Sequence, residues 1–199
     1  MAGNVVLGAL RHLWLTLQGM NVPAAVMGGI ALSAWEHVRA TRDVDLLIGV
    51  ESGDLDSLLQ QLRSAGVRPK REPPTVALGK LRMVQLLYEP PETFVDVQVD
   101  LLLADSEYHR GALARSVAMR LPDLDCDVFV LTVEDLVLHK LIAGRIVDRA
   151  DAATLLRINR DRLDLGYLLA WAASLQVTTE LAEIWAEAFP GEQLPATRP

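Results

Sequence analysis

The sequence predicts an α+β fold: a small mixed sheet with helices, followed by a helical C-terminal lobe. A short apolar strand, a helix and a second strand fit residues 25–48. Strand-like runs at 81–88 and 94–103 flank the turn sequence Glu-Pro-Pro-Glu, which predicts an antiparallel hairpin. After a last short strand at 128–131, only helical patterns follow. Strands placed before helices in this way favour α+β layering.

Turn and capping residues set the remaining boundaries. Apolar positions recur at helical spacing over residues 4–19. Residues 67–74, which contain prolines and three cations, are expected to form a loop; the cations suit either a polyanion or a solvated connector. A Thr-x-x-Asp capping box at Thr132 begins a helix. We therefore divide the chain into a core, 1–131, and a helical C-terminal lobe, 132–199, and expect the two to form one compact unit.

The composition suits a folded enzyme or binding module. Of 199 residues, 51% are hydrophobic and 23% charged, so the chain can bury a substantial core. The net charge of -7 argues against a protein that coats nucleic acid, although it allows a local basic patch. The single cysteine, Cys126, excludes an internal disulfide and a Cys-based zinc site. No signal peptide or membrane span is recognisable, so we expect a cytoplasmic protein that does not contact membranes.

The most informative stretch runs from residue 27 to 48. Gly28 and Gly29 follow the first strand and leave room for a ligand to approach the backbone. The helix that follows directs its free N–H groups and positive dipole end to the same place, which suits phosphate. Asp43 and Asp45 alternate along the second strand, so both carboxylates point to one face. Such carboxylates repel each other unless a cation lies between them, and magnesium prefers oxygen ligands.

Taken singly, Gly-Gly is usually a turn and Asp-x-Asp is usually a solvated strand end. The joint order of strand, Gly-Gly, helix and Arg-x-Thr-x-Asp-x-Asp-Leu is much rarer. This stretch resembles the signature of the nucleotidyltransferase superfamily, in the form found in AbiEii-like, toxin-type nucleotidyltransferases. The resemblance covers roughly residues 20–157. It implies a polymerase-beta-like fold and the transfer of a nucleoside monophosphate from an NTP, with one or two Mg2+ ions as cofactor.

The resemblance also implies roles for individual residues. Asp43, Asp45 and Asp100 would be the catalytic, metal-binding carboxylates, since a third acid allows a second metal ion to bind. Asp100 is preferred because Val-Asp-Leu-Leu-Leu resembles the third-acid strand of the family; Asp96, which shares a face with Asp100 and Gln98, is the alternative. The expected nucleotide-binding residues are Gly28, Gly29, Ser33, Arg39, Thr41 and Lys140.

A second block, from Thr132 to Asp151, resembles the family's acid-Asp-Leu helix with a Lys, followed by Arg and Asp-x-x-Asp. Lys140 lies on a mostly apolar helical face, where its ammonium group needs a partner. The triphosphate is the partner that we favour, and Asp148 or Asp151 is the alternative. Arg145 and these two aspartates are expected to position the Lys140 side chain or to stabilise the C-terminal lobe, without contacting the substrate.

The acceptor is open: a hydroxyl on RNA (a tRNA end), on a protein or on a small molecule. Related enzymes are toxins of toxin–antitoxin pairs, so an antitoxin partner or a homo-oligomer is compatible with the sequence. A catalytically silent module of the same fold, binding a nucleotide or a protein, is the alternative from another class. A dinucleotide-binding Rossmann unit is excluded because no Gly-x-Gly-x-x-Gly follows the first strand. His37 and His139 show no metal-ligand spacing and are expected at the surface or in packing.

Overall fold

The computed structural model describes residues 2–51, 53–78, 81–121 and 124–195. Contacts divide the chain into two compact units. The first comprises residues 1–30 and 39–131, and the second comprises residues 31–38 and 132–199. The segment 31–38, within the stretch that resembles the family signature, thus belongs with the C-terminal helices.

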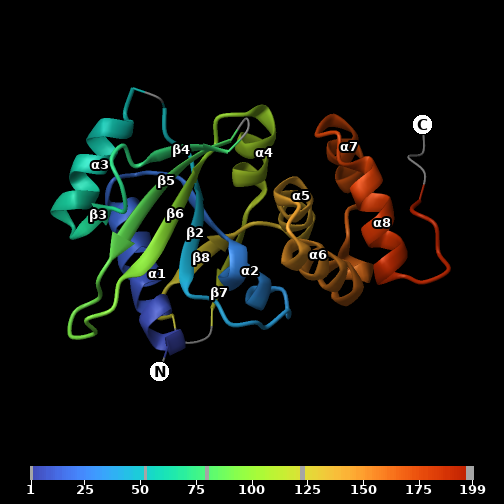
Figure 1. Cartoon of the computed structure of the whole chain (residues 1–199), viewed down its shortest axis with the longest axis horizontal. Coiled ribbons are helices and arrows are strands. Elements are labelled where there is room, and N and C mark those ends of the chain that lie inside the picture. Colours follow the sequence, from blue (N-terminus) through green and yellow to red (C-terminus); the bar gives the residue numbers. More distant parts are fainter. Residues whose placement is uncertain (1, 52, 79–80, 122–123, 196–199) are drawn as a thin grey trace. The chain divides into compact units, whose positions relative to one another are not determined.

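The first unit is a sheet with helices packed on it (Figure 1). Its elements are α1 (Ala2–Gly19), β1 (Ala24–Met27), the start of α2 (Gly28–Ala34), β2 (Asp43–Ile48), α3 (Leu55–Ser64), β3 (Val67–Pro69), β4 (Thr75–Leu78), β5 (Leu81–Tyr88), β6 (Val97–Leu103), α4 (Glu107–Arg115), β7 (Val117–Arg120) and β8 (Asp127–Val130). The strand order is β3-β5-β6-β2-β1-β8-β7, and β4 also pairs with β5.

The sheet is mixed, as predicted. β2 pairs with β6 and β1 with β8 in parallel, whereas the remaining pairs are antiparallel. The predicted hairpin is formed by β5 and β6. With the helices that follow, this arrangement confirms the predicted fold class.

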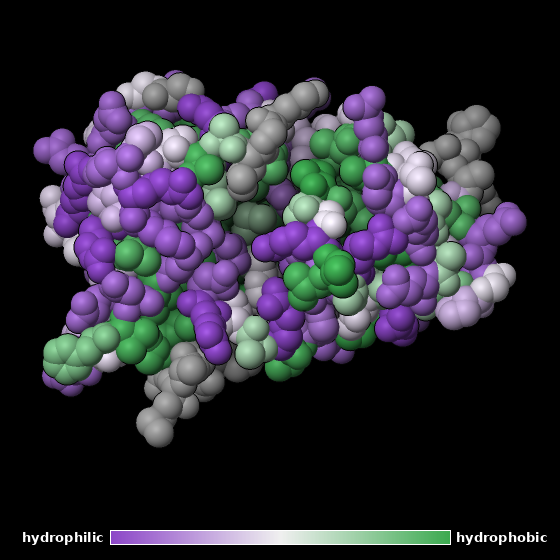
Figure 2. Space-filling view, viewed as in Figure 1, coloured by the Kyte–Doolittle hydropathy of each residue, from purple (hydrophilic) through white to green (hydrophobic). Residues whose placement is uncertain are grey.

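Alternation along the strands gives the sheet two different faces. Val44 and Leu46 of β2 lie beside Val99 and Leu101 of β6, and all four are fully buried. Each such side chain contributes about 1.5–3 kcal/mol through burial. The intervening residues, which point the other way, are polar near the start of both strands. In Figure 2, the visible face over β5 and β6 is mostly hydrophilic. The apolar face therefore contributes to the hydrophobic core, and the polar face carries side chains that can bind a ligand.

Three short strands were not predicted. The segment expected as a loop, 67–74, begins with β3, which pairs with β5; β4 and β7 also pair along the sheet. These strands have three or four residues, too few for a period-2 pattern to be recognised. The second run of the hairpin also starts later than predicted, at Val97. Glu92 and Phe94 have φ values of 64° and 52°, which are incompatible with an extended strand.

The second unit is helical. It contains α5 (Val133–Ala143), α6 (Ile146–Ile158), the short 3-10 helix η1 (Arg160–Arg162), α7 (Leu165–Ser174) and α8 (Thr178–Ala188). Thr132 caps α5 as predicted, because its hydroxyl accepts a hydrogen bond from the Asp135 amide. Gly144 ends α5 with a left-handed φ of 67°. In the described part of the chain, no helix combines the length and the apolar character needed to cross a membrane.

Candidate active site

The two glycines allow the second strand to approach the backbone closely. Gly28 has a φ of +62°, and a Cβ built there would lie 1.9 Å from Oδ2 of Asp45. A Cβ on Gly29 would lie 2.7 Å from Oγ1 of Thr41. Any other residue at either position would displace these side chains. The space that the glycines leave is therefore used by the protein's own polar side chains from residues 41–45.

The predicted acids gather on the polar face of the sheet. In the parallel pairing of β2 with β6, Asp45 lies opposite Asp100 and Asp43 lies opposite Gln98. Residues in register on neighbouring strands share a face, so the three carboxylates project to the same side. Burial raises the pKa of Asp100, a hydrogen bond from Gln98 lowers it, and the nearby Asp43 charge raises it further; the net pKa is raised. Burial is therefore the main cause of the raised pKa, and the neighbouring carboxylate of Asp43 adds to it.

Hydroxyl and amide groups hold two of these acids. The Thr41 hydroxyl donates to Oδ1 of Asp43 at 2.5 Å. Nε2 of Gln98 donates to Oδ2 of Asp100 at 2.8 Å, and Nε2 of Gln85 lies 3.5 Å from Oδ1 of Asp100. The strand period predicts that Gln98 shares a face with Asp100, but no sequence signal indicates that its amide binds the carboxylate. Gln85 was missed, because only the pairing of β5 with β6 brings it to Asp100.

Asp96, the alternative third acid, has different surroundings. It precedes β6, its side chain is 38% exposed, and Nη2 of Arg68 lies 2.5 Å from its Oδ2. Asp100 lies within β6, directly beside Asp45. The geometry therefore favours Asp100 over Asp96 as the partner of Asp43 and Asp45.

The donor chemistry of this face suits a hard cation. Carboxylate oxygens are the ligands that Mg2+ prefers. The side chains as they stand do not close around an ion, because no three His, Cys, Asp or Glu residues in the described ranges are grouped as a metal site. The acids thus fit magnesium by the chemistry of their oxygen atoms and by the face of the sheet that they share.

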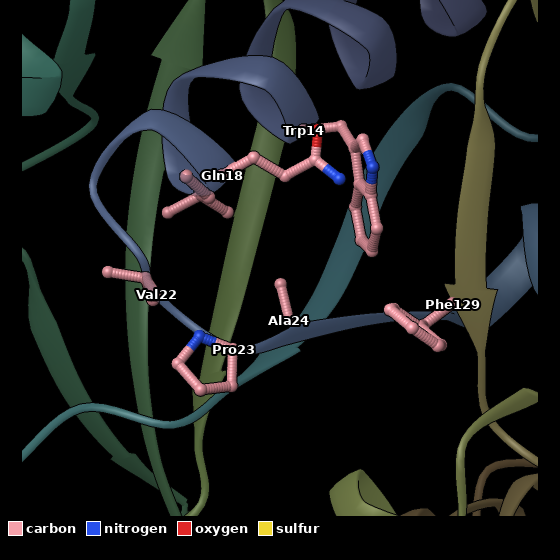
Figure 3. A pocket seen from close by; sticks show the side chains of 7 residues that line it. Trp14, Gln18, Val22, Pro23, Ala24 and Phe129 are labelled. Carbon is pink, nitrogen blue, oxygen red and sulfur yellow. The ribbon is translucent and has the colours of Figure 1, made fainter. Parts of the chain in front are cut away.

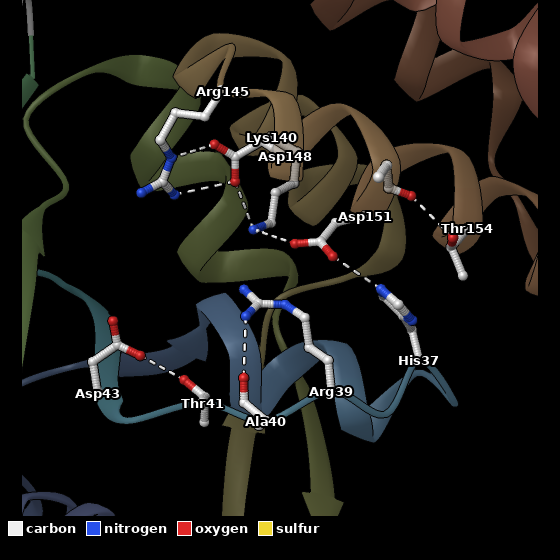
Figure 4. A network of polar contacts seen from close by, with 11 residues as sticks. His37, Arg39, Ala40, Thr41, Asp43, Lys140, Arg145, Asp148, Asp151 and Thr154 are labelled. Atoms are coloured by element: carbon white, nitrogen blue, oxygen red, sulfur yellow. Dashed lines mark hydrogen bonds and ion pairs between the residues drawn. The ribbon is translucent and has the colours of Figure 1, made fainter.

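Within the second unit, Lys140 is enclosed by acids (Figure 4). Its side chain is 8% exposed, and Nζ lies 2.8 Å from Oδ1 of Asp148 and 2.9 Å from Oδ2 of Asp151. Arg145 binds Asp148 through Nε at 2.5 Å and through Nη2 at 3.1 Å. Burial alone would raise the pKa of Asp148, but hydrogen bonds from Arg145 and Lys140 outweigh it and hold the pKa below the usual value.

His37 completes this cluster. Its Nε2 lies 3.0 Å from Oδ1 of Asp151, so the acid is contacted from both α5 and the segment 31–38. Sequence reasoning had set His37 aside, and with 114 residues separating it from Asp151 no local signal could have linked the two. The structure thus shows the ion pairing of Lys140 with Asp148 and Asp151 that the sequence analysis kept as its alternative. Phosphate binding by Lys140 stays a prediction.

The predicted site residues therefore fall into two groups. The first unit contains Gly28, Gly29, Arg39, Thr41, Asp43, Asp45 and Asp100, and the second contains Ser33, Lys140, Arg145, Asp148 and Asp151. Ser33 is exposed near the end of α2, and Nη1 of Arg39 donates to the carbonyl of Ala40 at 3.3 Å.

A small apolar pocket lies elsewhere in the first unit (Figure 3). It has a volume of about 100 Å³ and is lined by Trp14, Leu17, Gln18, Val22, Pro23, Ala24 and Phe129. Ala24 is at the beginning of β1, whereas the residue opposite Asp45 is at the end of that strand. None of the predicted site residues lines the pocket, so it is separate from the acids.

Solved structures share this fold. An antigenic nucleotidyltransferase-like protein from Paracoccidioides brasiliensis aligns with a TM-score of 0.51 at 19% identity, covering 92% of this chain and 96% of that one. The antibiotic-resistance factor ANT(2'')-Ia aligns with a TM-score of 0.53 at 16% identity, covering 92% and 97%. Identities this low show the fold alone. The chain thus has the nucleotidyltransferase fold.

The family follows from the sequence. The profile of the nucleotidyl transferase AbiEii toxin family, of type IV toxin–antitoxin systems, matches residues 9–197. The protein therefore belongs to the AbiEii nucleotidyltransferase toxin family, which confirms the resemblance. The match also includes the helices after residue 160, where sequence reasoning had recognised nothing. No curated protein sequence matches the chain.

Proposed function

We propose that this protein is a magnesium-dependent nucleotidyltransferase that moves a nucleoside monophosphate from an NTP to a hydroxyl group. One observation supports this most directly: Asp45 and Asp100 lie opposite each other on β2 and β6, and the Asp45 carboxylate occupies the space that a side chain at Gly28 would fill. Asp43 lies on the same face and is close enough to influence the titration of Asp100. Family membership supports the same reaction class.

In this reaction the acceptor oxygen forms a bond to the α-phosphorus, the bond to the pyrophosphate leaving group breaks, and the hydroxyl proton is released. Bound magnesium would neutralise phosphate charge and make the hydroxyl more acidic. Asp43, Asp45 and Asp100 would hold the metal. The hydroxyl of Thr41 would keep one oxygen of Asp43 fixed, and Gln98 would do the same for Asp100.

The nucleotide contacts are proposed as Gly28, Gly29, Ser33, Arg39, Thr41 and Lys140. For Lys140 the observed contacts favour a structural role, since both carboxylates already satisfy the buried ammonium group. Binding a triphosphate would require Lys140 to exchange at least one of these partners. Arg145, Asp148 and Asp151 are proposed to order Lys140 and the helices that carry it.

Membership of a toxin family supports a role as the toxin of a toxin–antitoxin pair. The acceptor is then a hydroxyl on RNA, such as a tRNA end, or on a protein or a small molecule. The competing function is a catalytically silent module. It is favoured by one observation, that in the described part of the chain the acids are not grouped as a closed metal site.

A labelling experiment separates these functions. The protein is incubated with each α-labelled NTP, Mg2+ and a mixture of total RNA and protein, and the labelled product is identified by size and by nuclease or protease sensitivity. We expect label transfer that disappears with a metal chelator and in Asp45→Asn. Nucleotide binding without transfer from any NTP, by a protein that is fully folded, would support the silent module instead.

A further inference from the structure

Two glutamines connect the third acid to two cations. Nε2 of Gln98 donates to Oδ2 of Asp100 at 2.8 Å, and Oε1 of the same amide accepts from Nζ of Lys70 at 2.5 Å. On the neighbouring strand, Nη2 of Arg71 donates to Oε1 of Gln85 at 2.6 Å. Nε2 of Gln85 lies 3.5 Å from Oδ1 of Asp100. Each oxygen of Asp100 thus faces a glutamine amide whose other end is held by a cation.

These contacts fix the direction of each amide. A lysine ammonium only donates hydrogen bonds, and a carboxylate only accepts them. The Gln98 side chain can satisfy both neighbours in one orientation alone, with oxygen towards Lys70 and nitrogen towards Asp100. Asp100 by itself would select the same amide direction, and Lys70 adds a second anchor at the oxygen end of the side chain. Without Lys70, the half-exposed Gln98 side chain is free to leave Asp100 for solvent. Lys70 therefore restrains Gln98 in the rotamer that holds Asp100.

The backbone holds the cations in place. The amide of Lys70 donates to the carbonyl of Gln85 at 3.0 Å, and the amide of Gln85 donates to the carbonyl of Pro74 at 2.9 Å. β3, which immediately precedes Lys70, pairs with β5. The basic segment 67–74 is thus anchored by its backbone to the strand that faces the third acid, while Arg68, Lys70 and Arg71 remain exposed to solvent.

From this geometry we propose that Lys70 is a positioning residue that acts through Gln98 to orient the Asp100 carboxylate for metal binding. Arg71 acts in the same way through Gln85, although the contact between Gln85 and Asp100 is longer, at 3.5 Å. This inference rests on the proposed function, in which Asp100 is a metal ligand. Hydrogen-bond partners of metal-binding carboxylates typically influence metal affinity or activity about 10–100-fold.

Charge alone predicts the opposite effect, which makes the inference testable. Lys70 is a cation close to a site for a divalent cation, so removing its charge should leave metal binding unchanged or tighten it. If Lys70 positions Asp100, its removal should weaken metal binding. The sign of the change in Lys70→Met therefore separates the two explanations.

The experiment measures Mn2+ binding to the full chain without nucleotide, from the free-Mn2+ signal in electron paramagnetic resonance. Mn2+ is used alone as the probe. We expect Lys70→Met and Gln98→Leu to weaken binding by about 10-fold, towards the lower end of the range for such partners. Lys70→Arg, which retains a donor, should restore most of the affinity. In transfer assays, the Mg2+ concentration for half-maximal rate should rise in parallel.

Arg68→Met is the matched control. Arg68 belongs to the same segment, but its guanidinium pairs with Asp96. Its loss therefore removes the same charge and leaves the contacts from Lys70 to Gln98 and from Gln98 to Asp100 in place. Unchanged or tighter Mn2+ binding in Lys70→Met would overturn the inference while leaving the proposed function intact. Full transfer activity in Asp100→Asn would instead refute the proposed role of Asp100, and the inference with it.

Discussion

Replacing Lys140 with Met tests what the buried ammonium does. Methionine retains the length and packing of the lysine stem and removes the charge. The side chains of Asp148 and Asp151 are 0% and 4% exposed, so both carboxylates would remain in the interior of the second unit without their shared cation. We therefore expect the apo protein to lose stability.

The size of the loss follows from the remaining partners. Breaking a buried ion pair typically costs about 3–5 kcal/mol. Here Asp148 retains two hydrogen bonds from Arg145, and Asp151 retains His37, so the lower end, about 3 kcal/mol, is expected. For a chain of this length, that loss corresponds to a fall in Tm of roughly 6–12 °C.

The assay is thermal and urea denaturation of the nucleotide-free protein, followed by circular dichroism. Arg149→Met is the matched control, since Arg149 forms an exposed pair with Glu183 that should contribute at most about 1 kcal/mol. Nucleotide affinity is measured by calorimetry on both variants. If Lys140→Met keeps or gains apo stability and loses about 10- to 100-fold in NTP affinity, the structural explanation is refuted and Lys140 binds phosphate.

Four further outcomes are expected. Asp45→Asn should abolish most label transfer while leaving apo stability unchanged or higher, because repulsion between carboxylates is relieved; a large loss of apo stability would contradict this. Asp100→Asn should be inactive and Asp96→Asn active, and the reverse result in the transfer assay would make Asp96 the third acid. Gly28→Ala should lower Tm, since its Cβ would clash with Asp45 at a φ of +62°; an unchanged Tm would show that the strand shifts easily. Because the pKa of Asp148 is lowered by folding, its contribution to stability is present above the unfolded pKa and is lost as pH falls through the folded pKa. Acid titration of Asp148→Asn should therefore show a shallower stability loss than wild type, and parallel curves would contradict the assignment.

The sequence predicted those features that depend on local spacing. Asp43 and Asp45 alternate on one strand, so their common face follows from the period of a β-strand. The capping box at Thr132 and the hairpin of β5 and β6 are equally local. That Asp100 shares this face depends on the parallel pairing of two strands that are distant in the sequence. Periodicity cannot predict that pairing, and the choice of Asp100 came from the family resemblance.

Long-range polar partners were not predictable. Lys70 is 28 residues from Gln98, and Gln85 is 15 residues from Asp100, so only the assembled sheet brings these side chains together. The pairing of His37 with Asp151 depends in the same way on the packing of the helical unit. For Lys140, burial on an apolar helical face was predicted correctly, but the choice between partners depended on how α6 packs against α5.

The assignment of residues 31–38 to the C-terminal helices has a consequence for biosynthesis. Within that unit, the carbonyl of Trp35 accepts from Asn159, His37 contacts Asp151, and Glu36 pairs with Arg162. The segment leaves the ribosome early, but its partners are translated more than a hundred residues later. The stretch between the double glycine and the acids therefore cannot reach its final contacts until most of the chain has been made. A nascent or prematurely terminated chain would therefore lack the ordering of residues 31–38 that these contacts provide.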